Sequence, residues 1–229
     1  MLYIRKANER GHANHGWLDS YHTFSFASYY DPKFMGFSDL RVINEDRVKA
    51  GFGFGTHPHN NIEILSYVLE GTIAHKDSMG NVEELKAGEF QIMSAGTGLT
   101  HSEYNPSDVE NLHFYQIWIE PNERNIEPRY DQKAFEAKKG ATLILSPTAE
   151  DGSFKVYQDM KLWRYQLDAN KTEQLSLDSK RNYWLQVVKG DFSINGSQVF
   201  TSDGIALSQE DVAFIETTMD VEFLLFDLA

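Results

Sequence analysis

The hydrophobic positions of the chain fall in short runs that are separated by glycine, asparagine or proline. These runs are rich in leucine, isoleucine, valine and aromatic residues, and the clearest cover residues 64–69, 90–93, 112–119, 143–145, 184–188 and 223–226. Many short strands with turn residues between them are typical of a β-sandwich or β-barrel, and not of alternating strands and helices. No long apolar pattern recurs about every 3.6 residues, so we expect helices to be few and short.

A weak internal repeat indicates that the fold contains two barrels. Residues 67–71 resemble residues 186–190, and each copy is followed by two further glycines, at 80 and 88 in the first and at 196 and 204 in the second. A chain of 229 residues has room for two domains of about 100 residues each. We therefore predict an all-β protein with two jelly-roll-like β-barrels in tandem.

The polar stretch between the two copies, about 121–140, contains two prolines and several charged residues, which is typical of a connection between domains. We predict an N-terminal barrel over residues 1–125, a linker over 126–140 and a C-terminal barrel over 141–229. All eight histidines precede residue 114, so we expect a metal site in the N-terminal barrel and no metal ligands in the C-terminal one.

Composition narrows the function further. No apolar run approaches the roughly 20 residues that span a bilayer, and no apolar stretch follows the early charges, so we expect neither a membrane segment nor a signal peptide. The lack of cysteine excludes thiolate metal sites and suits a cytoplasmic protein. A net charge of −13 with scattered basic residues disfavours direct nucleic-acid binding, whereas a protein partner stays open. We expect a monomer.

Two triplets carry spacing that points to chemistry, His57-Pro58-His59 and His101-Ser102-Glu103. Residues two apart in a strand point to the same face, roughly 6.6 Å from one another. If the two strands face one another in a barrel, three imidazoles and one carboxylate converge at bonding distance from an ion. This donor set suits one divalent transition metal with an open coordination position. We expect Fe(II), with Ni, Cu, Mn, Co or Zn as alternatives, and a purely structural metal as the competing interpretation.

Glycines frame both triplets. Gly51 precedes His57 by six residues, Glu63 follows His59 by four, and Gly88 opens the stretch before His101. This arrangement resembles the two cupin motifs, although Ser94 replaces the usual proline and two extra residues precede the second histidine. A more specific resemblance is to the pirin family, and it is carried by residues 17–27, 30–32, 53–59, 93–98 and 101–103. The resemblance covers residues 17–119 in order and is much thinner in the second half.

The resemblance implies a bicupin fold with one metal. In pirins the ligands are both histidines of the first triplet and the histidine and glutamate of the second, which correspond to His57, His59, His101 and Glu103. Many other cupins use the glutamate at the position of Glu63. That residue therefore stays open as an alternative ligand or as a group that orients a histidine through its free ring N–H.

The resemblance to bacterial pirins implies a quercetin 2,3-dioxygenase-like oxidoreductase. Such an enzyme opens the central ring of a flavonol with O₂ and releases carbon monoxide, and the metal stabilises the deprotonated substrate hydroxyl. We expect Glu103 to act as the catalytic base. Eukaryotic pirins imply an alternative, a non-catalytic metal-dependent co-regulator or redox sensor that binds a partner protein. An enzyme that does not use O₂ is a third class, because cupins host many reactions.

The remaining histidines are expected to be structural. We expect His12 and His15 to be solvated, His22 to be a hydrogen-bonded structural residue and His113 to pack in the core. We place His75 on the barrel exterior or in a hairpin.

Overall fold

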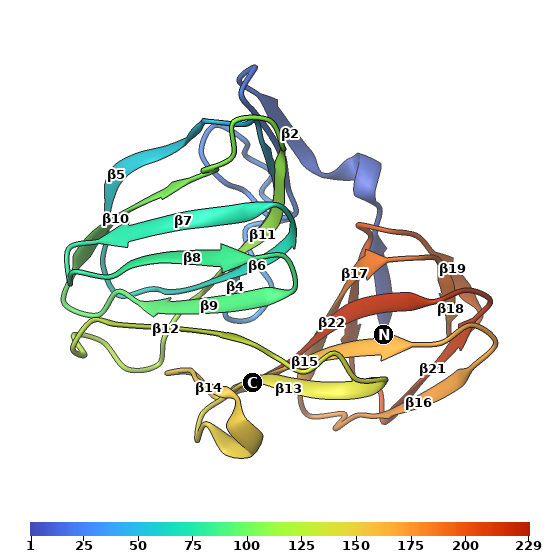
Figure 1. Ribbon diagram of the computed structural model, residues 1–229. Helices are drawn as coiled ribbons and strands as arrows, with labels where there is room; N and C mark the ends of the chain where they lie inside the picture. The colour runs from blue at the N-terminus through green and yellow to red at the C-terminus, as the bar shows by residue number, and fades with distance from the viewer. The chain divides into compact units, whose positions relative to one another are not determined.

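The computed structural model describes residues 1–229 and consists almost entirely of strands (Figure 1). The two helices, Ala7–Glu9 and Glu150–Gly152, are single 3₁₀ turns, and no helix has the length and apolar character needed to span a membrane. The predicted all-β fold with few short helices is confirmed. Contacts divide the chain into two compact units, one of Gly11–Phe135 and one of Met1–Arg10 with Glu136–Ala229.

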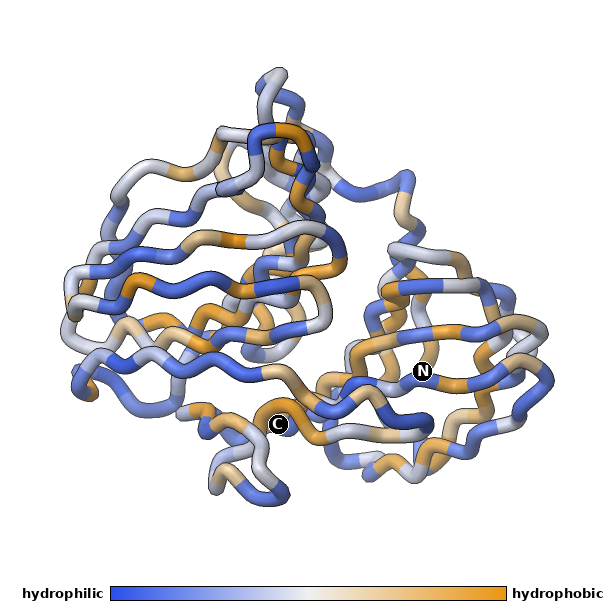
Figure 2. The backbone as a smooth tube through the Cα atoms, viewed as in Figure 1, coloured by the Kyte–Doolittle hydropathy of each residue, from blue (hydrophilic) through white to orange (hydrophobic).

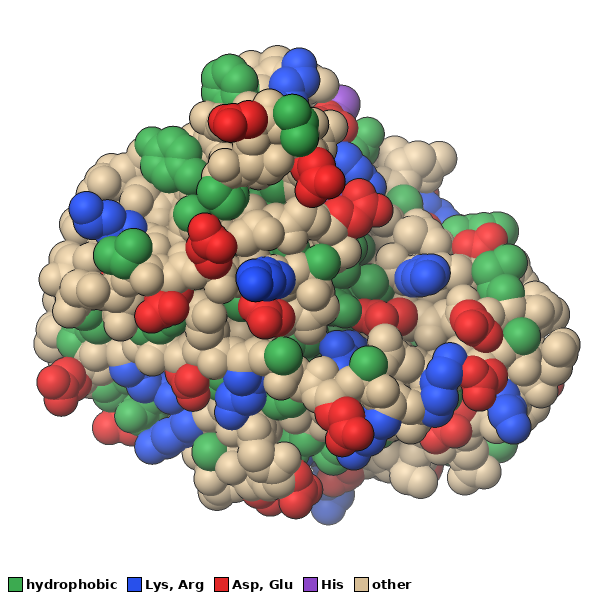
Figure 3. All heavy atoms as spheres, viewed as in Figure 1, with side chains coloured by type: hydrophobic (Ala, Val, Ile, Leu, Met, Phe, Trp, Pro, Cys, Tyr) green, Lys and Arg blue, Asp and Glu red, His purple; other side chains and the backbone are tan.

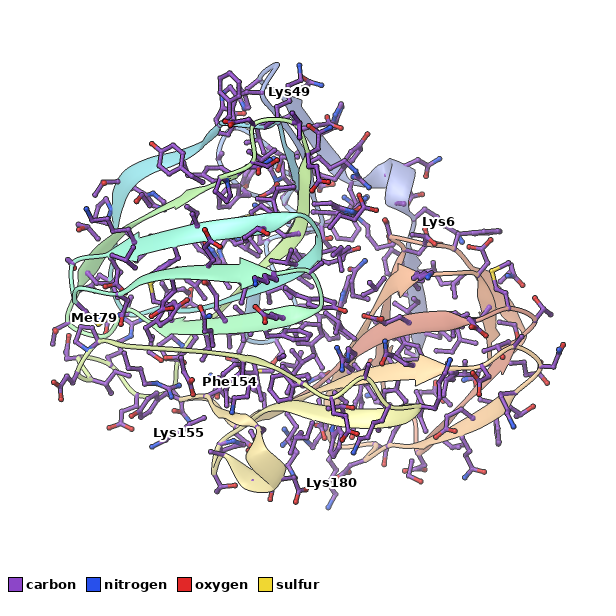
Figure 4. The ribbon with its side chains drawn as sticks, in the orientation of Figure 1. Lys6, Lys49, Met79, Phe154, Lys155 and Lys180 are labelled. Atoms are coloured by element: carbon purple, nitrogen blue, oxygen red, sulfur yellow. The ribbon has the colours of Figure 1, made fainter.

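The unit formed by Gly11–Phe135 contains two antiparallel sheets. The larger sheet has the order β12-β9-β6-β11-β4-β3-β2 and the smaller has the order β5-β10-β7-β8. The strands are β2 (Gly11–Asn14), β3 (Leu18–His22), β4 (Leu40–Val48), β5 (Gly53–His59), β6 (Glu63–Glu70), β7 (Thr72–Asp77), β8 (Val82–Lys86), β9 (Glu89–Ser94), β10 (Leu99–Tyr104), β11 (Leu112–Ile119) and β12 (Arg129–Ala134). Side chains fill the space behind β7 and β8, whose connecting turn carries the labelled Met79 (Figure 4).

One row of interior positions in the larger sheet is polar. Strand register sets His22 beside Asn44, Asn44 beside Gln116, Gln116 beside Ser66 and Ser66 beside Gln91, and all five are buried. Apolar clusters lie on either side of this row; they include Val48, Val68 and Phe114 on one side and Ile64, Met93 and Leu99 on the other. Because buried polar groups need hydrogen-bond partners, such a row inside a barrel indicates a site and not only a core.

The second unit repeats the arrangement of the first. Its larger sheet has the order β1-β20-β17-β22-β15-β13-β14 and its smaller sheet the order β16-β21-β18-β19. The strands are β1 (Leu2–Arg5), β13 (Gly140–Ser146), β14 (Phe154–Lys155), β15 (Met160–Leu167), β16 (Thr172–Ser176), β17 (Asn182–Lys189), β18 (Phe192–Ile194), β19 (Ser197–Val199), β20 (Gly204–Ser208), β21 (Val212–Thr217) and β22 (Val221–Leu228). Apolar residues recur along its strands and form one continuous core (Figure 2).

The internal repeat seen in the sequence corresponds to matching hairpins. Gly71 joins β6 to β7 and Gly190 joins β17 to β18, with φ of +79° and +78°. A Cβ on Gly71 would lie 2.8 Å from the Asn111 carbonyl oxygen, and one on Gly190 would lie 2.6 Å from that of Asp220. Only glycine combines this backbone conformation with such a close approach, which explains why both copies keep it.

The structure distributes two segments differently from the predicted boundaries. Leu2–Arg5 pairs with β20 and so belongs to the second unit, although the first domain was placed over residues 1–125. Arg129–Ala134, within the predicted linker, forms an edge strand on β9. Both segments are short, and β1 pairs with a partner about two hundred residues away, which no local pattern reveals.

On the face drawn in Figure 3, basic and acidic side chains are interspersed.

Candidate metal centre

Strands β5 and β10 pair so that their histidines face one another. In this antiparallel register His101 lies opposite His57, and Leu99 lies opposite His59. A β-bulge separates His101 from Glu103, because Gly55 and Thr56 together oppose a single residue of β10. A bulge of this kind re-aims the side chains on either side of it. The histidines of the two predicted triplets are therefore brought to one place.

The three histidines His57, His59 and His101 form a tight cluster. Their ring centroids lie 4.5–4.9 Å apart, and one ligand nitrogen from each lies within 4.8 Å of the others. The Nδ1 atom of His57 is 2.8 Å from the Gly55 carbonyl oxygen, so Nδ1 carries the proton and donates it, and Nε2 is left to bind an ion.

His101 shows that the cluster fits a metal. It is buried, and neither of its ring nitrogens has a hydrogen-bond partner. A buried polar atom without a partner is costly, and a bound ion would satisfy it. Burial and the neighbouring imidazoles lower the pKa of His101 to about 3 and that of His59 to about 4. Both imidazoles are therefore neutral near pH 7, which is the form that binds a metal.

Glu103 lies beside this cluster and is held by three side chains of the polar row. Its carboxylate accepts hydrogen bonds from Gln91 Nε2 and Gln116 Nε2, both at 3.0 Å, and from Ser66 Oγ at 3.4 Å. Burial raises the pKa of Glu103. One of its oxygens forms a second potential metal-ligating group with His101 and His75, whose ligand atoms also lie within 4.8 Å of one another. His101 is thus common to both groups.

His75 is the residue that the sequence interpretation missed. It was placed on the barrel exterior or in a hairpin. It does lie in the β7–β8 hairpin, but the exterior placement is wrong, because His75 is 1% exposed and lies on β7 opposite Glu103. Its Nε2 is 3.2 Å from Asp77 Oδ2, its Nδ1 has no partner, and its ring stacks on Tyr130 with centroids 4.5 Å apart. Ile73, His75 and Asp77 alternate along β7 and form its buried face.

Glu63 occupies a different environment from Glu103. Its buried carboxylate accepts a hydrogen bond of 2.8 Å from Ser94 Oγ and lies 3.5 Å from Arg129 Nη2. It belongs to neither of the two metal-ligating groups. Ser94, which replaces the proline usual in cupins, therefore has a role in holding this carboxylate.

Three other histidines, His12, His22 and His113, lie within hydrogen-bond distance of side-chain oxygen atoms, and His15 is exposed, as predicted. His22 Nδ1 lies 2.9 Å from Asn44 Oδ1, which agrees with a hydrogen-bonded structural role. His113 is only partly buried and bonds Glu45 at 3.0 Å, so it does not simply pack in the core. His12, expected to be solvated, is exposed but pairs with Asp19 at 2.6 Å and stacks on Tyr21.

A cavity of about 400 Å³ opens beside His57 and His59 within the Gly11–Phe135 unit. Its walls are largely apolar and include Leu18, Phe26, Phe54 and Trp118, and its polar lining comes mainly from β3, β4 and Gln116. The same two histidines also line a shallower hollow with Arg41, Glu120 and Arg124. An ion held by the histidines would therefore be accessible to a ligand of small-molecule size.

Comparison with known proteins identifies relatives along the whole chain. The Pirin family model matches residues 3–119, and the model described as the quercetinase C-terminal cupin domain matches residues 143–228. The chain is 62% identical to quercetin 2,3-dioxygenase of Escherichia coli K12 over 100% of this chain and 99% of the relative. It is 37% identical to a pirin-like protein of Caulobacter vibrioides, with full coverage of both chains.

Solved structures give the same relationship. The crystal structure of the bacterial pirin YhhW from Escherichia coli in complex with nickel(II) has a TM-score of 0.97 at 61% identity and covers 100% of this chain and 99% of that one. A quercetin 2,3-dioxygenase from Acinetobacter baumannii matches at a TM-score of 0.75 with 20% identity, and this likeness shows the fold alone.

Proposed function

The chain belongs to the pirin family of bicupin proteins, and we propose that it is a metal-dependent oxygenase that cleaves the central ring of flavonols such as quercetin with O₂. The observation that carries the proposal is the cluster of three histidines beside an accessible, mostly apolar cavity. The relative named quercetin 2,3-dioxygenase, at 62% identity over the full chain, supports this substrate class.

The proposed ligands of one divalent metal are His57, His59, His101 and Glu103. Fe(II) is the proposed native ion, with Ni, Cu, Mn, Co and Zn as alternatives; the nickel(II) complex of the relative supports nickel among them. When bound, the ion supplies charge that stabilises the deprotonated hydroxyl of the flavonol next to it. His57 is fixed for this task by its bond to the Gly55 carbonyl oxygen.

The proposed role of the protein is to bind, orient and deprotonate the flavonol. Apolar walls exclude water from the reacting ring and would contact its aromatic faces. Glu103 is the proposed catalytic base that takes the proton from the substrate hydroxyl, since its carboxylate is buried and has a raised pKa. The two glutamines that bond Glu103 keep it oriented. In the overall reaction one flavonol and one O₂ yield the ring-opened ester and one carbon monoxide.

Metal-loaded protein should consume quercetin in air, with loss of the flavonol absorbance and release of carbon monoxide in equal amounts. His101→Ala should lose bound metal and turnover together, because His101 takes part in both ligating groups. The matched control His12→Ala removes an exposed histidine from β2 and should retain both. Absence of metal-dependent turnover, with tight binding of a protein partner, would favour a co-regulator instead, and turnover without O₂ would favour another metal-dependent reaction.

A further inference from the structure

Several polar groups of the cavity wall already have hydrogen-bond partners in the protein. His22 bonds Asn44 at 2.9 Å, Gln116 Nε2 donates to Glu103, and Gln116 Oε1 accepts from Trp118 Nε1 at 3.1 Å. These pairs fix the wall and leave few groups to meet a ligand.

Asp46 on β4 is a buried carboxylate of the cavity wall with only one of its two oxygens bonded. It lines the cavity together with His57 and His59, and only 3% of its surface is exposed. Oδ1 accepts a hydrogen bond from Ser20 Oγ on the neighbouring strand β3. Oδ2 accepts no hydrogen bond, and it is not fully enclosed by protein. Oδ2 therefore faces the cavity.

The surroundings of Asp46 do not explain it as part of an ion pair. No lysine, arginine or histidine forms a salt bridge with it, and the neighbouring charged groups that act on it are the carboxylates of Glu45 and Glu103. In the pairing of β4 with β11, the residue opposite Asp46 is the apolar Phe114. Burial raises the pKa of Asp46 to about 7, so the carboxyl group carries its proton over much of the range below neutrality and can donate as well as accept.

We propose that Asp46, oriented by Ser20, is a specificity-determining residue that hydrogen-bonds a second oxygen of the bound polyphenol, away from the oxygen at the metal. This inference rests on the proposed function, because it places a flavonol in the cavity. A molecule seated against His57 and His59 in this enclosed space also reaches the wall that carries Asp46. A hydroxyl at that point completes the bonding of Oδ2, whereas an analogue without it leaves a buried polar atom unpaired.

The test measures binding without oxygen, so that it does not depend on turnover. Nickel-loaded wild type, Asp46→Leu and Asp46→Asn are titrated anaerobically with quercetin, with galangin, which lacks the catechol hydroxyls, and with fisetin, which lacks one hydroxyl of the other ring. In the wild type, either galangin or fisetin should bind roughly tenfold more weakly than quercetin, depending on which of the missing hydroxyls Asp46 contacts. Asp46→Leu should weaken quercetin by a similar factor and reduce the difference between quercetin and that analogue to about twofold or less.

Matched variants keep the result interpretable. Asp19→Asn makes the same chemical change one residue from Ser20 at a position outside the cavity lining and should bind all three flavonols like the wild type. If Asp46→Leu loses its metal or its fold, Asp46→Asn decides, since it keeps the volume and should change the quercetin-to-analogue ratio by threefold or more. Equal weakening of all three ligands, or an unchanged ratio, overturns the inference. Discriminating binding without turnover in air would overturn the proposed function alone.

Discussion

The orphaned imidazole of His101 predicts that one substitution will have opposite effects with and without metal. In the metal-free protein both ring nitrogens are buried without partners. His101→Leu removes one donor and one acceptor and keeps a side chain of similar size. Leaving such groups unsatisfied costs about 1–3 kcal/mol, so the metal-free variant should be more stable than the wild type by about 2 kcal/mol. At about 3 °C for each kcal/mol, its Tm in chelator should rise by about 6 °C.

Bound metal should make the wild type more stable than the His101→Leu variant. An ion present at one hundred times its Kd stabilises the native state by about 2.7 kcal/mol, which corresponds to a rise of about 8 °C for the wild type. The variant lacks the histidine shared by both ligating groups, so its Tm should rise little when metal is added. The assay is thermal unfolding at pH 8, once in EDTA and once with nickel(II).

A second histidine substitution serves as the control for the His101 experiment. His113→Leu breaks the bond to buried Glu45 and should destabilise the protein equally in both buffers. If His101→Leu lowers the Tm in EDTA, the imidazole is not an unsatisfied group in the metal-free protein. If nickel(II) raises the variant and the wild type equally, His101 is not a ligand. Either result refutes the reasoning.

Three further predictions follow from single contacts. His75→Phe keeps the stack on Tyr130 but removes the free nitrogen beside the cluster; it should weaken metal binding by about tenfold in a chelator competition, and full affinity would assign His75 to packing only. Gly71→Ala should cost about 1–3 kcal/mol in denaturant unfolding, whereas Gly80→Ala, also at positive φ but with open space at Cβ, should cost about 1 kcal/mol; equal losses would contradict the clash. The pKa of Asp46 is raised in the folded state to about 7, so wild-type stability relative to Asp46→Asn should be greatest below pH 4 and decline as the pH rises through 7, which urea titrations at several pH values would detect.

The metal cluster could be predicted from the sequence because the spacing of its histidines within each strand is a local feature. Alternation within a strand sets His57 and His59 on one face whatever the fold, and the glycines around both triplets carried the resemblance to the cupin motifs. The position of Glu103 was harder to predict, because a bulge separates it from His101 and changes the register. The structure groups it with His75 as well as with His101.

His75 could not be placed from the sequence, because its neighbours on the same face include Asp77. A carboxylate two residues away indicates an exposed face, yet Asp77 is 7% exposed. The hairpin turn satisfies it: Met79 N and Asn81 N donate to Oδ1 at 2.9 and 3.1 Å, and Asn81 Nδ2 donates to Oδ2 at 2.7 Å. Burial of this strand thus depends on a turn whose hydrogen bonds become visible only once the chain is folded.

The two barrels have the same arrangement of sheets but different interior residues, and this difference indicates which barrel carries the functional site. By sheet order, β16 and β21 stand in the second unit where β5 and β10 stand in the first. Their buried apolar residues are Leu175, Ala213 and Ile215, which belong to a continuous apolar core, and the buried residue that ends β21 is Thr217. An apolar interior is the less costly way to stabilise a barrel, since each buried polar group must find a partner. The first barrel retains a polar row, three histidines and Glu103 despite that cost. The second shows that the same sheet arrangement forms without them, so the polar interior of the first is best explained by the ion and the ligand proposed for it.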